Sequence, residues 1–104
     1  MRNYLPSHNV VFHDFPKESV PGFSFSKEDV IHEDFLKLKR HLHLKRAEML
    51  GNSYKSKVRI MFQTANGEMK RIYTTVWAAT SDYIAIKSGV SIPTKSIVSI
   101  DFDL

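Results

Sequence analysis

Residues 57–102 alternate short runs of β-branched and aromatic side chains with turn signals. The turn signals are Asn66-Gly67, Ser81-Asp82, Ser88-Gly89 and Ile92-Pro93. Short strand-forming runs at such intervals are typical of small antiparallel β proteins. The pattern predicts five antiparallel strands, at about residues 57–63, 69–79, 83–87, 90–92 and 97–102, closed into a small barrel.

The Asn66-Gly67 pair favours a two-residue type I′ turn, because both residues tolerate positive φ. This turn would place Met61 opposite Ile72 and Ile60 opposite Tyr73, and it would assign side chains alternately to two faces. The predicted core face carries Val58, Ile60, Phe62, Tyr73 and Trp77, and the predicted outer face carries Lys57, Arg59, Gln63 and Lys70.

Two features shape the remaining strands. The run 69–79 is long for a small barrel, so we expect a bend near Thr74-Thr75 that lets it pair at both ends. Pro93 cannot donate to a β ladder, which favours a tight turn through Thr94 to Ser96 before the last strand.

This order of strands, with a tight helical turn before the last one, resembles SH3-like and Sm-like small β-barrels. The stretches GEMKRIYTTVWA and IPTKSI also resemble small bacterial proteins of this type. The resemblance covers the C-terminal half of the chain. It implies a five-stranded antiparallel barrel and no particular functional residue.

Residues 26–51 carry a helical pattern, with Ser26 and Asp29 as N-terminal capping residues and Gly51-Asn52 as the stop. One apolar row follows helical spacing and predicts the face that packs on the barrel. Its members are Ile31, Phe35, Leu38, Leu42 and Met49.

A second row lies about 120° around the same helix. It consists of Leu36, His43, Ala47 and Leu50, with Leu44 beyond it. A helix of about 24 residues is about 36 Å long, whereas a barrel of about 50 residues is only about 25 Å across. One barrel cannot cover both rows, so we expect either the aromatic N-terminal arm or a second subunit to cover the remainder.

Residues 1–25 hold three of the four prolines and are too apolar for a free linker. We expect this segment to be an arm that wraps onto the rest. The prediction is one α+β domain over residues 1–104: an arm (1–25), a long amphipathic helix (26–51) and a five-stranded SH3-like barrel (55–104).

Composition narrows the function classes. The 104-residue chain has 15 basic and 11 acidic residues, a formal charge of +4, and no cysteine. Disulfides, thiolate nucleophiles and cysteine-based zinc sites are therefore excluded. The sequence shows neither a signal peptide nor a membrane-spanning run, so we expect a cytoplasmic protein.

Basic residues suggest one possible site. In the run 37–46 the basic residues lie all around the helix and do not form a phosphate-binding stripe. Acidic residues occupy the first half of the helix and basic residues the second half, which complements the helix dipole. The outer face of the first hairpin is the better candidate for binding single-stranded RNA or DNA, although solvated lysines are ordinary there. This candidate set is Tyr54, Lys55, Lys57, Arg59 and Lys70.

No motif predicts catalysis, a metal site or a cofactor. His41 and His43 are two residues apart, so they point in different directions on a helix and cannot share a metal. Glu28 and His32 are four residues apart and could meet, but His32-Glu33 lacks the second histidine of an H-E-x-x-H motif. We expect no enzyme activity, no metal and no cofactor.

Two functions remain. The first is a non-enzymatic interaction or self-association module that binds protein through Leu36, His43, Leu44, Ala47 and Leu50. The alternative is nucleic-acid binding through the outer face of the 57–79 hairpin. We expect neither a membrane nor a small-molecule substrate as partner.

Overall fold

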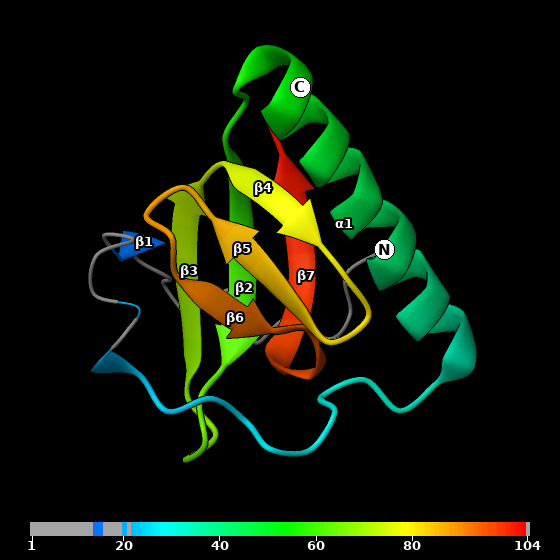
Figure 1. Cartoon of the computed structure of the whole chain (residues 1–104). Helices are drawn as coiled ribbons and strands as arrows, with labels where there is room; N and C mark the ends of the chain where they lie inside the picture. Colours follow the sequence, from blue (N-terminus) through cyan, green and yellow to red (C-terminus); the bar gives the residue numbers. More distant parts are fainter. Residues whose placement is uncertain (1–13, 16–19, 21, 104) are drawn as a thin grey trace.

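The computed structural model describes residues 14–15, 20 and 22–103. One long helix and several short strands make up this part of the chain, which confirms the predicted α+β class (Figure 1). The elements in order are β1 (Asp14–Phe15), α1 (Asp34–Tyr54), β2 (Val58–Gln63), β3 (Met69–Thr74), β4 (Val76–Ala79), β5 (Tyr83–Ile86), β6 (Ser91–Pro93), the 3-10 turn η2 (Thr94–Ser96) and β7 (Ile97–Phe102).

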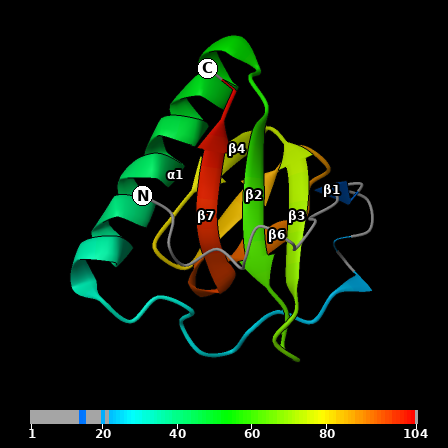
Figure 2. The ribbon, with the colours of Figure 1, turned by 180° about the vertical axis from the view of Figure 1, so that it is seen from behind.

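The strands form two sheets, with orders β1-β3-β2-β7 and β4-β5-β6. The three-stranded sheet lies in front of the other in Figure 1 and behind it in Figure 2. All pairs are antiparallel except β1 with β3. The predicted closed five-stranded barrel is therefore wrong, because the strands separate into two stacked sheets with the core between them. Fully buried side chains from both sheets fill this core, among them Ile60, Phe62, Ile72, Ile84, Ile86, Ile92 and Ile97.

The predicted bend in the run 69–79 is confirmed. β3 ends at Thr74 and β4 begins at Val76, and the two belong to different sheets. Thr75 lies between them, buried, with its hydroxyl donating to the Lys55 carbonyl at 3.4 Å. The predicted turn before the last strand is also present, as η2.

The register of the first hairpin differs from the prediction by one residue, with Ile60 opposite Ile72 and Arg59 opposite Tyr73. Gly67 has φ +89° but Asn66 does not have positive φ, so the turn is not type I′. The loop has three residues instead of two, closed by the Gly67 N–H donating to the Thr64 carbonyl. Tyr73 consequently lies on the outer face of β3. Of the other predicted core residues, Val58, Ile60 and Phe62 in β2 are buried, whereas Trp77 in β4 is only half-buried.

The helix begins later and ends later than predicted. Ser26 does not cap it; Glu33 holds the N-cap position. Asp29 instead accepts a hydrogen bond from the Ile31 N–H at 2.9 Å in the loop before α1. At the other end Gly51 remains helical, and Lys55, at φ 56°, closes the helix by donating to the Gly51 carbonyl at 2.9 Å.

Gly51 determines how closely α1 approaches the sheets. A Cβ at this position would come closer than 3.0 Å to the backbone carbonyl oxygen of Val76 in β4. Leu44 and Ala47, which lie on the same side of α1, are each only 1% exposed. We call the side of α1 with Leu44, Ala47 and Gly51 its inner face; it packs against β4 and β7.

Most of the predicted arm, residues 1–13, 16–19 and 21, lies outside the described residues. Among those described, Val20 is fully buried in the core. The rings of Phe23 and Phe25 lie 5.8 and 5.3 Å from that of Phe62. These side chains therefore extend the core beyond the two sheets.

Candidate functional site

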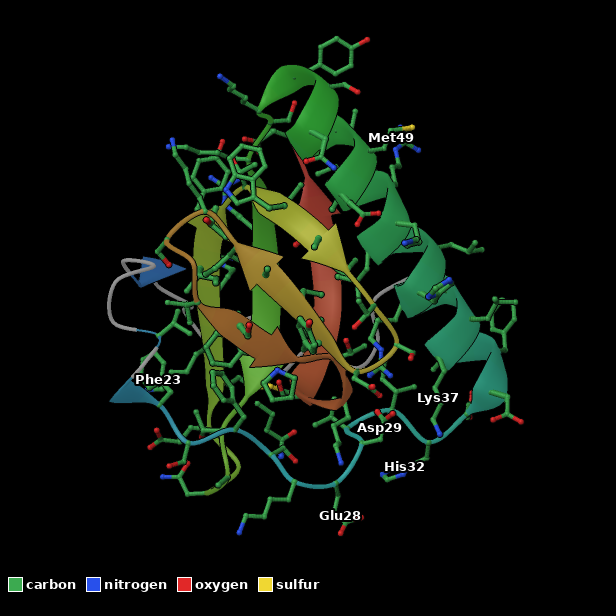
Figure 3. All side chains as sticks on the ribbon, in the orientation of Figure 1. Phe23, Glu28, Asp29, His32, Lys37 and Met49 are labelled. Carbon is green, nitrogen blue, oxygen red and sulfur yellow. The ribbon has the colours of Figure 1, made fainter. Side chains whose placement is uncertain are left out.

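The side of α1 opposite the inner face carries a row of exposed apolar side chains. Phe35 is 72% exposed, Leu38 55%, Leu42 57% and Met49 58%. We call these four residues the outer row. Figure 3 shows Met49 on the side of α1 that faces away from the sheets. Single exposed apolar residues are ordinary, but four on one face of a helix mark an interaction surface.

The structure thus reverses the two rows predicted from sequence. The row predicted to pack on the barrel contained these four residues and Ile31. The four are exposed on α1, whereas Ile31 lies in the loop before the helix and is half-buried. The residues predicted as a protein interface lie toward the body instead: Leu44 and Ala47 are buried, and Leu36, His43 and Leu50 are half-buried. Gly51 lies on this same side of the helix, where the absence of a side chain allows the close approach of α1 to Val76.

An ion pair fixes the inner face to the rest of the protein. Arg40, 7% exposed, donates two hydrogen bonds to the Asp29 carboxylate, at 2.9 and 3.0 Å, and one to the Ile97 carbonyl at 3.1 Å. Burial of Asp29 raises its pKa, but the hydrogen bonds from Arg40 and the Ile31 N–H outweigh burial and hold this pKa below its ordinary value. Arg40 therefore joins α1 to both the preceding loop and β7.

Two side chains of α1 also form hydrogen bonds with backbone groups of β4. The Ala79 N–H donates to Glu48 Oε2 at 2.9 Å, and Lys45 Nζ donates to the Ala79 carbonyl at 3.1 Å. Lys45 also pairs with Glu48 Oε1 at 3.1 Å. The hydrogen bond from Ala79 is the main cause of the lowered pKa of Glu48. These contacts draw the Lys45 ammonium away from the outer row.

Charges on the two flanks of the outer row differ. Lys39 and Arg46 lie along one flank, and the Arg46 guanidinium lies 5.4 Å from the centre of the Phe102 ring. On the other flank Asp34 occupies the first turn of α1. The row therefore has a basic border on one side and an acidic residue at the start of the other.

His43 shows the environment at the border of the inner face. Its ring meets that of Phe102 edge-on, with centroids 5.8 Å apart. Burial lowers the pKa of His43, and the nearby charges of Lys39 and Arg46 lower it further, against a smaller opposing effect of Asp101. This histidine is a packing residue, because its ring is held between the helix and β7.

The predicted nucleic-acid set is divided between two faces. Arg59 lies on the outer face, with its guanidinium 4.4 Å from the centre of the Tyr73 ring, and pairs with Asp103 at 2.6 Å. Tyr73 also donates a hydrogen bond to Asp103, and these two bonds lower the pKa of that carboxylate. Lys57 is nearby, with Nζ 5.6 Å from the same ring.

The other members of the set lie elsewhere. Lys70 is opposite Phe62 in the ladder, which places it on the other face of the hairpin. It pairs with Glu68 at 3.2 Å and lies 5.5 Å from the Phe23 ring centre. Tyr54, 76% exposed, and Lys55 are at the C-terminal end of α1. The five residues do not converge on one surface.

Metal and membrane sites can be assessed only over the described residues. There, no three histidine, aspartate or glutamate side chains come together as potential metal ligands. His8 and His13 lie outside this part of the chain. Likewise, α1 is not apolar enough to cross a membrane.

The comparisons with known proteins give no family assignment. Neither a protein-family model, nor a curated protein, nor a solved structure matches this chain.

Proposed function

We propose that this protein is a non-enzymatic protein-interaction module that binds its partner through the outer row of α1. The observation that carries this proposal is the exposure of Phe35, Leu38, Leu42 and Met49 along one face of a helix. Burying such side chains releases free energy, about 1.5–3 kcal/mol for each when burial is complete.

The outer row is separate from the part of α1 that holds the fold together. Arg40, Leu44, Ala47 and Gly51 make up the buried residues of the helix, and all lie on its inner face. A partner can therefore cover the outer row without disturbing these contacts. This arrangement corresponds to helix recognition through side chains spaced three, four and seven residues apart.

We further propose a relationship to SH3-like and Sm-like folds. Two features support it: one continuous run that passes from the first sheet to the second at Thr75, and a helical turn, η2, before the last strand. This relationship concerns architecture and transfers no binding residue.

Nucleic-acid binding is the weaker proposal. Its predicted residues lie on both faces of the hairpin, and Arg59 and Lys70 each pair with a carboxylate. An electrostatic site for phosphates needs several cations on one surface.

Photo-crosslinking tests the protein-interaction proposal. A benzophenone side chain at position 35 replaces an exposed aromatic residue on the outer row, and the same group at Tyr83, 47% exposed on β5, is the matched control. After irradiation in cells, position 35 should give discrete protein adducts that are absent for position 83 and lost with Leu42→Glu. Equal labelling at both positions, or adducts to lipid alone, would refute the proposal.

A further inference from the structure

The outer row follows a seven-residue repeat. Phe35, Leu42 and Met49 are seven residues apart, and Leu38 and Lys45 interleave with them at the same interval. These are five of the six a and d positions of a coiled coil, over the three heptads that fit in the 21 residues of α1, and the sixth, a d position, is Asn52. A helix with this repeat is suited to pack side by side with another helix along its whole length.

The only charged residue in this seam does not oppose close packing. Lys45 occupies a d position, but its ammonium is held by the Ala79 carbonyl and Glu48 at 3.1 Å each. Glu48 of the same chain thus supplies a countercharge for the half-exposed Lys45, whose methylene stem can pack along the seam. Four of the six seam positions are therefore apolar, and the other two are Lys45 and Asn52.

Flanking charges indicate what kind of helix would fit. In a parallel pair, each g position faces the e position five residues further along the other helix. Asp34 is at g and Lys39 is at e, so Asp34 of each copy would face Lys39 of the other, twice by symmetry. The next contact, His41 with Arg46, carries no opposite charges.

The antiparallel arrangement is less favourable. There, e positions face e positions, so the basic flank of one helix would lie against the basic flank of the other. Lys39 would then approach Arg46 of the second copy, and like charges repel. Charge complementarity therefore favours two parallel copies of this helix.

The available area suits a dimer of moderate affinity. Each outer-row side chain exposes on the order of 100 Å², so the four supply about half of the roughly 800 Å² per partner of a standard interface. The stems of Lys39, Lys45 and Arg46 add to this area. α1 forms one edge of the molecule in both ribbon views, which leaves room for a second helix beside it (Figures 1 and 2).

We infer that the partner of the outer row is a second copy of this chain, with the two α1 helices packed in parallel and in register. This inference rests on the proposed function, because it names the occupant of the same surface. The dissociation constant should be on the order of micromolar.

Sedimentation measurements test the self-association. From about 1 to about 500 µM protein, the mass should rise from that of the 12.0 kDa chain to twice that value. Leu42→Glu should remain a monomer, whereas Tyr83→Glu, on β5 and outside α1, should still dimerise. A wild-type monomer at every concentration would overturn this inference, while protein adducts from position 35 to another chain would leave the proposed function standing.

Single cysteines test the parallel register, since the natural chain contains none. With Met49→Cys alone, oxidation should give a covalent dimer, because residue 49 meets its own copy in a parallel pair. In an antiparallel pair residue 49 would lie near residue 38, about 16 Å along the helix from its own copy, beyond disulfide reach. Crosslinking only in a mixture of Met49→Cys and Leu38→Cys would overturn the parallel arrangement.

A charge swap tests the cross-helix pair. Asp34→Lys and Lys39→Asp should each weaken the dimer by about tenfold, and the double variant should recover most of this loss. Circular dichroism confirms that each variant remains folded. Strengthening by Lys39→Asp alone would contradict the inference, because it would indicate that Lys39 faces a basic residue.

Discussion

Gly51→Ala tests the contact that orients α1. The glycine lies on the inner face, where a Cβ would meet the Val76 carbonyl oxygen closer than 3.0 Å and the Thr75 methyl at 3.0 Å. Neither neighbour can easily move, because Thr75 is buried and Val76 belongs to the ladder between β4 and β5. The added methyl must therefore push α1 away from β4.

Helix propensity and steric overlap have opposite effects on the stability of Gly51→Ala. Replacing glycine by alanine inside a helix contributes about 1 kcal/mol of stability through helix propensity. Inserting a methyl group into a packed contact costs about 1–3 kcal/mol, and a clash with backbone belongs at the upper end. The net loss is therefore about 2 kcal/mol. For a domain of this size it corresponds to a fall of about 8–16 °C in Tm.

The assay is urea unfolding at a protein concentration low enough to keep the chain monomeric, followed by circular dichroism. Asn52→Ala is the matched control, because Asn52 is the next helical residue, is exposed, and reports propensity alone. It should stabilise the fold by a few tenths of a kcal/mol. If Gly51→Ala raised the urea midpoint as Asn52→Ala does, α1 would not approach β4 through this face.

Three further predictions concern the two faces of α1 and its contacts. Leu44→Ala should lower the free energy of unfolding by about 2–5 kcal/mol, whereas Leu42→Ala should change that of the monomer by less than about 0.5 kcal/mol in urea titrations; equal losses would contradict the assigned faces. The pKa of Asp29 is lower in the folded state than in the unfolded chain, where it is about 3.9. The ionised Asp29 therefore contributes its full stabilisation at pH values above about 3.9, and this stabilisation is lost as the pH falls through the pKa of the folded state. Between pH 6 and 2 the free energy of unfolding should therefore fall less for Asp29→Asn than for the wild type. If it fell equally for both proteins, Asp29 would not contribute to the pH dependence of stability. Glu48→Ala removes the acceptor of the Ala79 N–H. Hydrogen exchange of the Ala79 amide, measured by NMR, should therefore accelerate about tenfold. Unchanged exchange would show that this hydrogen bond does not protect the edge of β4.

Much of the strand arrangement was predictable from sequence because its signals are local. The bend at Thr74-Thr75 and the end of β6 at Pro93 depend only on residues that are close in the sequence. The hairpin register was not predictable, since Asn66-Gly67 fits both a two-residue and a three-residue loop. That single residue of difference moved Tyr73 from the predicted core to the outer face.

The orientation of α1 was missed because the sequence offers two apolar rows of similar strength. The predicted capping role of Asp29 was also wrong, because its carboxylate pairs with Arg40, 11 residues away, instead of capping a helix. One signal could have resolved the choice. Gly51 lies within the helical pattern, and a glycine inside a helix often marks close approach of another backbone. It lies on the side of Leu44 and Ala47.

Two apolar rows on one helix need not compete for the same core. The inner face is fixed by an ion pair at Arg40, by the approach at Gly51 and by the Glu48 contact with β4, none of which involves the outer row. The helix is thus already folded when a partner arrives, so binding does not have to offset the entropy of ordering a chain. A substitution at Leu42 should accordingly alter association while leaving the fold intact. That separation makes the outer row a surface whose function can be measured independently of stability.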